Sequence, residues 1–153
     1  MKKLPEVDEA KALMKEAVSW SVMKWLKEKK RVRKAADKAN NYLWALQKAV
    51  RDSWPDELKT AYAELDGGGG RSQHKAMART ASNEIKLLVQ KVKQADDEAY
   101  QAHLDAEEVF DKADKRLSTS LAREGCRQAI RSWELYEEAI LKAEAAPVLR
   151  PKI

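Results

Sequence analysis

The feature that most constrains this chain is a stretch, residues 71–124, that contains neither glycine nor proline. Such a stretch can form one uninterrupted helix. Apolar residues recur along it at three- and four-residue steps, the spacing of one face of a long amphipathic helix. They are Met77, Ala81, Ile85, Leu88, Val92, Ala95, Ala99, Ala102, Ala106, Val109, Ala113 and Leu117. Because the middle of this face is alanine, we expect the backbone of a packing partner to approach it closely.

An earlier run has the same periodicity, and it predicts a first long helix over about 6–53. Pro5, followed by acidic residues, is a favourable helix start, because proline fits the first turn and acids favour the positive end of the helix dipole. A short helix is expected over 55–65, before the glycine-rich linker 66–70. The apolar positions of the first run are Met14, Val18, Trp25, Val32, Ala36, Ala39, Leu43, Leu46 and Val50.

The second long helix is expected over about 71–118 and the last over about 120–146, where Pro147 ends it. Capping oxygens in 118–120 and the helix-weakening Gly125 favour a turn within 118–125. The apolar periodicity nevertheless continues through this segment, which leaves a continuous helix as the alternative.

These elements predict an all-α fold, an elongated antiparallel helical bundle of three long helices plus one short helix. A chain of 153 residues has the length of a single domain, 1–153. Two long helices joined by a flexible turn should pack antiparallel as in a coiled coil, with the last helix along them. Each needs such a partner, since an isolated amphipathic helix leaves its apolar face in water.

Nothing in the sequence predicts export or membrane insertion. The N-terminus lacks the apolar core of a signal peptide, and no stretch reaches the roughly 18 apolar residues of a transmembrane helix. We therefore expect a cytoplasmic protein. Cys126 is the only cysteine, so an internal disulfide is excluded, and its apolar neighbours favour a buried, inert thiol.

The charge distribution suggests one candidate binding surface. The chain has a net charge of +5, and residues 24–38 hold eight bases and two acids, a local charge of +6. A basic stripe on the first helix could bind the phosphates of nucleic acid or of acidic lipid. Alternatively, the basic segment could pair with residues 96–114, which hold eight acids and one base, and so fix the register of the hairpin. The candidate anion-binding residues are Lys27, Lys30, Arg31, Lys34 and Lys38.

The tryptophans suggest a second surface. Trp25 fits the apolar face of the first helix, whereas Trp20 and Trp44 lie about 100° or more away from it at 3.6 residues per turn. They are covered either by the last helix or by another molecule. Trp20 and Trp44 are therefore candidates for an interaction surface.

No set of residues predicts catalysis, a cofactor or a metal. The Glu-x-x-His pairs of di-iron bundles are absent, because the residue three before His103 is Tyr100 and the one three before His74 is Arg71. His103 and Glu107 form an i, i+4 pair of the kind found in surface salt bridges. The glycines of 67–70 lack the spacing of a phosphate-binding loop.

We therefore expect a non-enzymatic interaction or scaffolding protein that recognises a protein partner or self-associates through its helix faces. The alternative, from a different class, is a binder of nucleic acid or acidic lipid through the basic stripe of the first helix.

Overall fold

The computed structural model describes residues 4–65 and 83–149, and every regular element in these ranges is a helix. The prediction of an all-α fold is confirmed for these residues. None of their helices is long and apolar enough to cross a bilayer. The predicted helix start at 71–82 and the linker at 66–70 lie outside the described residues. The helices are α1 (Pro5–Ala17), α2 (Val22–Asp52), α3 (Asp56–Ala63), α5 (Asn83–Arg116) and α6 (Thr119–Leu149).

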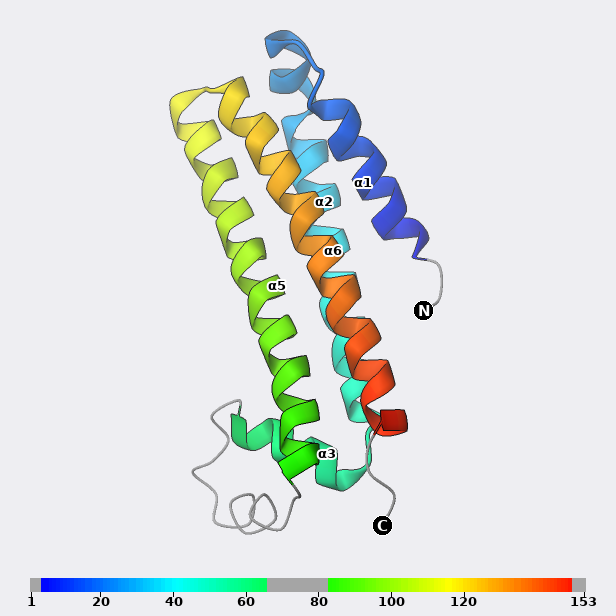
Figure 1. The fold of residues 1–153 in the computed structure, drawn as a ribbon. Coiled ribbons are helices and arrows are strands. Elements are labelled where there is room, and N and C mark those ends of the chain that lie inside the picture. Colours follow the sequence, from blue (N-terminus) through cyan, green and yellow to red (C-terminus); the bar gives the residue numbers. More distant parts are fainter. Residues whose placement is uncertain (1–3, 66–82, 150–153) are drawn as a thin grey trace.

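Helices α2, α5 and α6 run along a common direction, with α1 beside them and α3 across one end (Figure 1). Long-range pairs give the direction of α2 relative to α5. Arg33 contacts Asp111 at 3.2 Å, whereas Gln47, further along α2, contacts Asp96, which is earlier in α5. The two helices are therefore antiparallel, although each of them packs mainly on α6.

Helix α6 lies at the centre of the arrangement, in contact with α1, α2 and α5. Its most extensive contact is with α5, so α6, rather than the first helix, is the partner of the alanine face. The buried alanines of α5 permit this close approach. Helix α6 runs parallel to α2, because Trp133 bonds to Asn40 and Ala143, later in α6, bonds to Trp54 beyond the end of α2.

The single helix expected over 6–53 is instead two helices, and that prediction was wrong. The chain leaves the helix at Val18 and re-enters it at Val22. Ser19 Oγ donates to the Glu16 carbonyl at 2.8 Å, and Ser21 Oγ accepts from the Lys24 N–H at 3.2 Å as the N-cap of α2. These short polar side chains satisfy the two new helix ends, which makes the break possible.

A turn does separate the last two helices, as predicted, but Gly125 takes no part in it. The chain reverses at Leu117, whose φ is 51°, and Ser118 Oγ then accepts from the Leu121 N–H at 3.2 Å. Gly125 is buried inside α6, where a Cβ would lie 2.8 Å from Cδ1 of Phe110. The glycine is thus required for close packing of α5 on α6.

The prediction that the last helix ends before Pro147 was wrong, because α6 continues to Leu149. Proline lacks the N–H that would bond to the carbonyl four residues earlier, which is that of Ala143. This carbonyl instead accepts the indole N–H of Trp54 at 2.7 Å. A side chain from the segment between α2 and α3 therefore supplies the missing donor and allows one more turn of helix.

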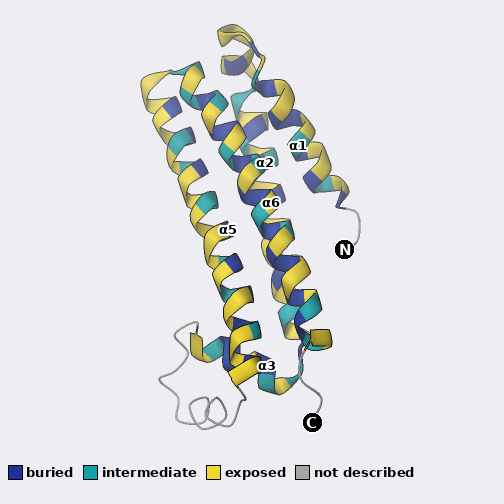
Figure 2. Ribbon diagram, viewed as in Figure 1, coloured by how far each residue is buried: buried dark blue, intermediate teal, exposed yellow. Residues whose placement is uncertain are grey.

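The buried residues form a band along the inner faces of the helices (Figure 2). They divide into two apolar clusters. The larger joins α1 and α2 to the adjoining parts of α5 and α6, and the smaller joins α3 to the start of α5 and the end of α6. On α5, the smaller cluster ends at Val92 and the larger begins at Ala99. The residues between these clusters position the candidate site.

Candidate functional site

A partly buried polar layer centred on Asp96 separates the two apolar clusters. Gln47 of α2 donates its side-chain N–H to this carboxylate, 2.8 Å from Oδ1 and 2.7 Å from Oδ2. The hydroxyl of Tyr62, on α3, donates to Oδ2 at 2.5 Å. Side chains of α2 and α3 thus converge on one carboxylate of α5, which ties the three helices together at a single level of the fold.

Arg51 completes the layer on the α2 side. Its Nε donates to Gln47 Oε1 at 2.8 Å and lies 3.9 Å from Asp96 Oδ2. Its guanidinium carbon lies 4.2 Å from the centre of the Tyr62 ring, a cation–π geometry. Each polar group is therefore bonded within the layer, as buried polar groups require.

Burial raises the pKa of Asp96 to about 6, because removing the carboxylate from water disfavours its charged form. The hydrogen bond from Tyr62 and the charge of Arg51 oppose this effect. The Asp96 side chain is only 13% exposed. Asp96 is thus a carboxyl group that gains or loses its proton near neutral pH.

The layer opens to the surface through a pocket of about 240 Å³. Trp44 of α2 and Tyr100 of α5 line this pocket and are 53% and 54% exposed, while Tyr136 of α6, also in the lining, is buried. Burial raises the pKa of Tyr136 to about 12, so its hydroxyl stays protonated at neutral pH. The pocket therefore joins a polar interior to two exposed aromatic rings on different helices.

All five predicted anion-binding residues are exposed on α2. Arg31 lies 3.6 Å from Glu28, and the other four have no ion pair among the described residues. Three of them line a groove of about 420 Å³ between α1 and α2, together with Glu6 and Glu9. The C-terminal part of the stripe therefore faces acidic groups of α1, whereas its N-terminal part, at Lys27 and Lys30, does not line this groove. The three groove-lining bases are Arg31, Lys34 and Lys38.

The acidic residues of α5 form their ion pairs mainly with bases other than these five. Arg33, which was not among the predicted site residues, contacts Asp111 and Asp114 at 3.2 Å each. Lys93 bonds to Asp97, and Lys112 lies 3.0 Å from Glu108, both within α5. The alternative of internal pairing is therefore correct for Arg33, and the pairing leaves the predicted stripe exposed.

The two tryptophans predicted to form an interaction surface have different surroundings. Trp20 is only 5% exposed, 6.3 Å from Trp25 between ring centres, and its carbonyl accepts from Arg123 at 3.0 Å. It therefore belongs to the core of the single chain, and including it in a surface was wrong. Trp44 is exposed, with Lys48 Nζ 5.6 Å from the centre of its ring.

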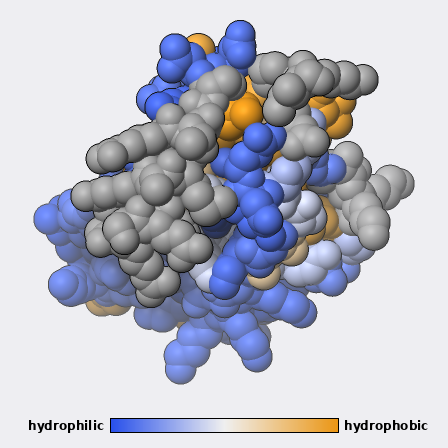
Figure 3. All heavy atoms as spheres, turned by 90° about the horizontal axis from the view of Figure 1, so that it is seen from below, coloured by the Kyte–Doolittle hydropathy of each residue, from blue (hydrophilic) through white to orange (hydrophobic). Residues whose placement is uncertain are grey.

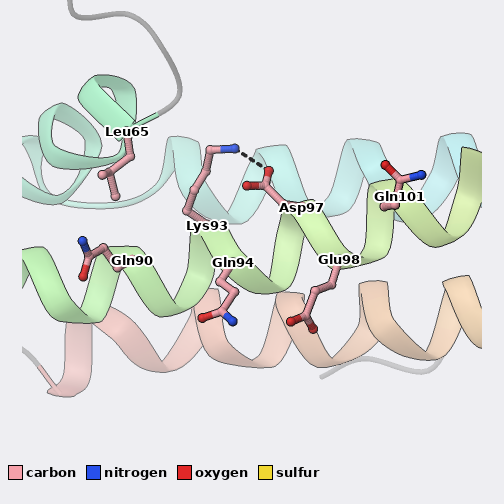
Figure 4. Close-up of a pocket in the computed structure, with 7 residues that line it drawn as sticks. All are labelled: Leu65, Gln90, Lys93, Gln94, Asp97, Glu98 and Gln101. Atoms are coloured by element: carbon pink, nitrogen blue, oxygen red, sulfur yellow. Dashed lines mark hydrogen bonds and ion pairs between the residues drawn. The ribbon is translucent and has the colours of Figure 1, made fainter.

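A larger and shallower depression lies on the outer side of α5 (Figure 4). Lys93 and Asp97 bond to each other there, while Gln94 and Glu98 point the opposite way. Polar groups that diverge in this manner do not hold one ligand. We therefore take the Asp96 pocket, where side chains converge, as the candidate site.

No group of three or more metal-binding side chains is found within residues 4–65 and 83–149. His103 Nε2 lies 3.3 Å from Glu107, and its Nδ1 is buried without a hydrogen bond to another described residue. Its ring centre is 6.3 Å from that of Tyr100. The His103–Glu107 pair is the i, i+4 contact expected from the sequence.

Sequence reasoning identified Trp44 but missed Asp96, Gln47, Tyr62 and Tyr100. The signal that was missed is their position. Gln47 lies four residues after Leu43, and Asp96 lies four residues after Val92, so each polar side chain continues the apolar face of its helix. A polar residue at a core position points to a buried partner. The identity of that partner depends on how the helices align.

No protein-family model matches this chain, and the searches of curated proteins and of solved structures found no significant similarity.

Proposed function

We propose that this chain is a non-enzymatic interaction module, an elongated antiparallel helical bundle that self-associates through Trp44 and Tyr100. The observation that carries the proposal is that these rings, each about half exposed, belong to different helices and line one pocket. Exposed tryptophan and tyrosine are the residues most enriched at the centres of protein interfaces.

The polar layer supports this role by holding the two rings at a fixed separation. Gln47 is three residues from Trp44 and Asp96 four residues from Tyr100, so the bond between Gln47 and Asp96 lies one helical turn from each ring. A rigid pair of aromatic side chains loses little conformational entropy on binding. The charged groups of the layer are bonded to one another, which favours a structural over a catalytic role.

The test is the mass of the protein in solution, measured by light scattering coupled to size exclusion over rising concentration. We expect a concentration-dependent dimer for the parent chain and a monomer for Trp44→Ala and Tyr100→Ala. Tyr42→Ala is the matched control, because Tyr42 is 40% exposed on α2 but does not line the pocket. A parent that stays monomeric throughout, or a control that behaves like the two variants, contradicts the proposal.

A second candidate function is binding of nucleic acid or acidic lipid by the basic stripe. It is favoured because Lys27, Lys30, Lys34 and Lys38 are exposed and have no ion pair in the described part of the chain. Lys27→Glu with Arg31→Glu should abolish retention on heparin and leave helicity unchanged. Arg127→Glu with Arg131→Glu applies the same charge change on α6 and should retain most of the affinity. Equal losses in both variants would mean that only net charge matters.

A further inference from the structure

One end of the molecule exposes apolar side chains on two separate turns. Met23 is 78% exposed, and Val22 and Leu26 are 52% and 45% exposed, all in the first turns of α2. Leu117, 73% exposed, lies at the α5–α6 turn with a φ of 51°. We call these four residues the apolar tip. Trp25, in the same turns of α2, is buried.

The two turns lie at the same end of the molecule (Figure 1). Arg123, early in α6, bonds to the carbonyl of Trp20 just before α2. The ring of Trp25 stacks on that of Phe110, with ring centres 6.5 Å apart and an interplanar angle of 3°. These contacts connect the two turns into one surface, so the four apolar side chains can meet the same partner.

Basic residues surround the apolar tip. Residues 22–31 hold five bases and one acid, a charge of +4, and residues 111–117 hold three bases and two acids, a charge of +1. The charges of these two segments add up to +5, which equals the net charge of the whole chain. Asp111 and Asp114 are already paired with Arg33. Lys27, Lys115 and Arg116 form no ion pair within the described ranges.

The described residues of the opposite end also expose apolar side chains, but bases and acids are balanced beside them. Leu87 and Val148 are 56% and 82% exposed near the start of α5 and the end of α6. Seen from this end, apolar atoms form a limited area on a mainly hydrophilic surface (Figure 3). Residues 56–65 hold three acids and one base, and residues 83–93 hold three bases and one acid, so the two segments together carry no net charge. A net excess of bases beside the exposed apolar side chains therefore distinguishes the α1–α2 end among the described residues.

We propose that this end docks on an anionic lipid bilayer, with the apolar tip inserted among the headgroups and the flanking bases on lipid phosphates. Apolar residues flanked by Lys and Arg are the signature of such interfacial binding. This proposal is a narrower form of the second candidate function. It names acidic lipid as the ligand and places the binding site at the end of the bundle rather than along the whole basic stripe. It does not depend on Trp44 or Tyr100.

The spacing along α2 determines which bases take part. With the helix axis near the membrane normal, a rise of 1.5 Å per residue places Lys27 about 6 Å and Lys30 about 10 Å from Met23. The headgroup layer is about 5–8 Å thick, and screening extends about 8–10 Å at physiological salt. Lys34 and Lys38, about 16 Å and 22 Å from Met23, lie beyond both distances. Only the near end of the stripe should therefore contribute.

Two other occupants fit this surface less well. Nucleic acid would use the bases but would leave the apolar tip in water, because phosphate contacts need no apolar residues. A second copy of this end would bring two positively charged surfaces together, which disfavours association through repulsion. An acidic bilayer satisfies both the apolar and the basic groups.

The experiment is co-flotation of the full chain with vesicles of equal parts phosphatidylcholine and phosphatidylserine, with pure phosphatidylcholine vesicles as the comparison. We expect binding to the acidic vesicles alone. Lys27→Gln with Lys30→Gln should weaken it by about 25-fold, since each base near the surface contributes about fivefold. Met23→Ser with Leu117→Asn should weaken it by about tenfold or more, because both substitutions remove apolar surface from the headgroup region. Asparagine is chosen because it tolerates the positive φ at Leu117.

The matched control is Lys34→Gln with Lys38→Gln, which removes the same charge from the same helix outside the headgroup layer. We expect it to bind within about threefold of the parent, as screening beyond a Debye length requires. Circular dichroism verifies that every variant is folded. Three results overturn the proposal: no binding of the parent to acidic vesicles, an equal loss in the control, or full binding by Met23→Ser with Leu117→Asn. The last result, combined with tight binding of duplex DNA, would identify a nucleic-acid surface instead. Loss of the Trp44 dimer leaves this test unaffected, so the two proposals fail separately.

Discussion

Trp54 and Pro147 are related through a single carbonyl group. The Trp54 indole N–H donates to the oxygen of Ala143 at 2.7 Å, and this is the acceptor that Pro147, four residues later, leaves without a helical donor. Ala143 is fully buried, so water cannot replace the indole. A tryptophan distant in sequence thus compensates for a proline inside a helix.

Trp54→Phe should lower the free energy of unfolding by about 1–3 kcal/mol, because it leaves a buried carbonyl without a donor. In a Pro147→Ala background the loss should be smaller, since alanine restores the helical N–H. Guanidinium unfolding followed by circular dichroism measures both. Trp44→Phe, at an exposed site, should change stability by less than about 0.5 kcal/mol. An equal loss in the two backgrounds would show that the indole acts through packing alone.

Gly125→Ala should destabilise the protein although alanine favours helices. The added Cβ would lie 2.8 Å from the Phe110 ring, which is held by stacking on Trp25 and by the Arg33 guanidinium 5.0 Å from its centre. Overpacking of about 1–3 kcal/mol exceeds the gain in helix propensity of about 1 kcal/mol. Thermal unfolding should show a net loss. In a Phe110→Leu background the same substitution should become neutral or stabilising, and its failure to do so would rule out the steric explanation.

Asp96 should make the protein less stable as pH rises from about 4 to about 6. Its pKa is about 6 in the folded chain against a usual value of 3.8, so in this window the folded state retains a proton that the unfolded state has lost. The unfolded state then binds fewer protons, and stability falls with rising pH until both states are ionised. We expect a contribution of about 2 kcal/mol, less than the full shift implies because the side chain retains some exposure.

Asp96→Asn isolates this contribution, since the amide has no proton to lose in this range and still offers an oxygen to Tyr62. Denaturation at several pH values should show that the variant lacks the parent's loss between about pH 4 and pH 6. Asp97→Asn is the control, because Asp97 is the exposed neighbour that pairs with Lys93. Burial, the main cause of the raised pKa of Asp96, is unchanged in this variant, whereas the smaller contribution of the Asp97 charge is lost. Asp97→Asn should therefore retain most of the pH dependence of the parent. A parallel dependence in parent and Asp96→Asn would assign the effect to other groups.

Cys126 should be unreactive until the protein unfolds. It is fully buried, and burial raises the pKa of its thiol to about 12, against a usual value of 9.0. At neutral pH this lowers the thiolate fraction by about a thousandfold, and the thiolate is the reactive form. Ellman's reagent should therefore label the native protein slowly and the guanidinium-unfolded protein at the rate of a free thiol. Rapid labelling of the native protein would indicate that α6 opens frequently.

The sequence by itself determined the all-helical character of this protein. It follows from local periodicity: apolar residues three and four apart define a helix face, and Trp25, Val32 and Ala99 lie on such faces whatever surrounds them. The exposure of Lys27 and the inert setting of Cys126 were predictable for the same reason.

Only the tertiary structure decided which helix face meets which partner. The burial of Trp20 and the continuation of α6 past Pro147 each depend on groups distant in sequence. The same is true of the Asp96 layer, where three helices must align before Gln47 and Tyr62 can reach one carboxylate. A repeating pattern specifies which residues turn inward but not the level at which helices align, because sliding one helix by a turn preserves the pattern and changes every polar partner.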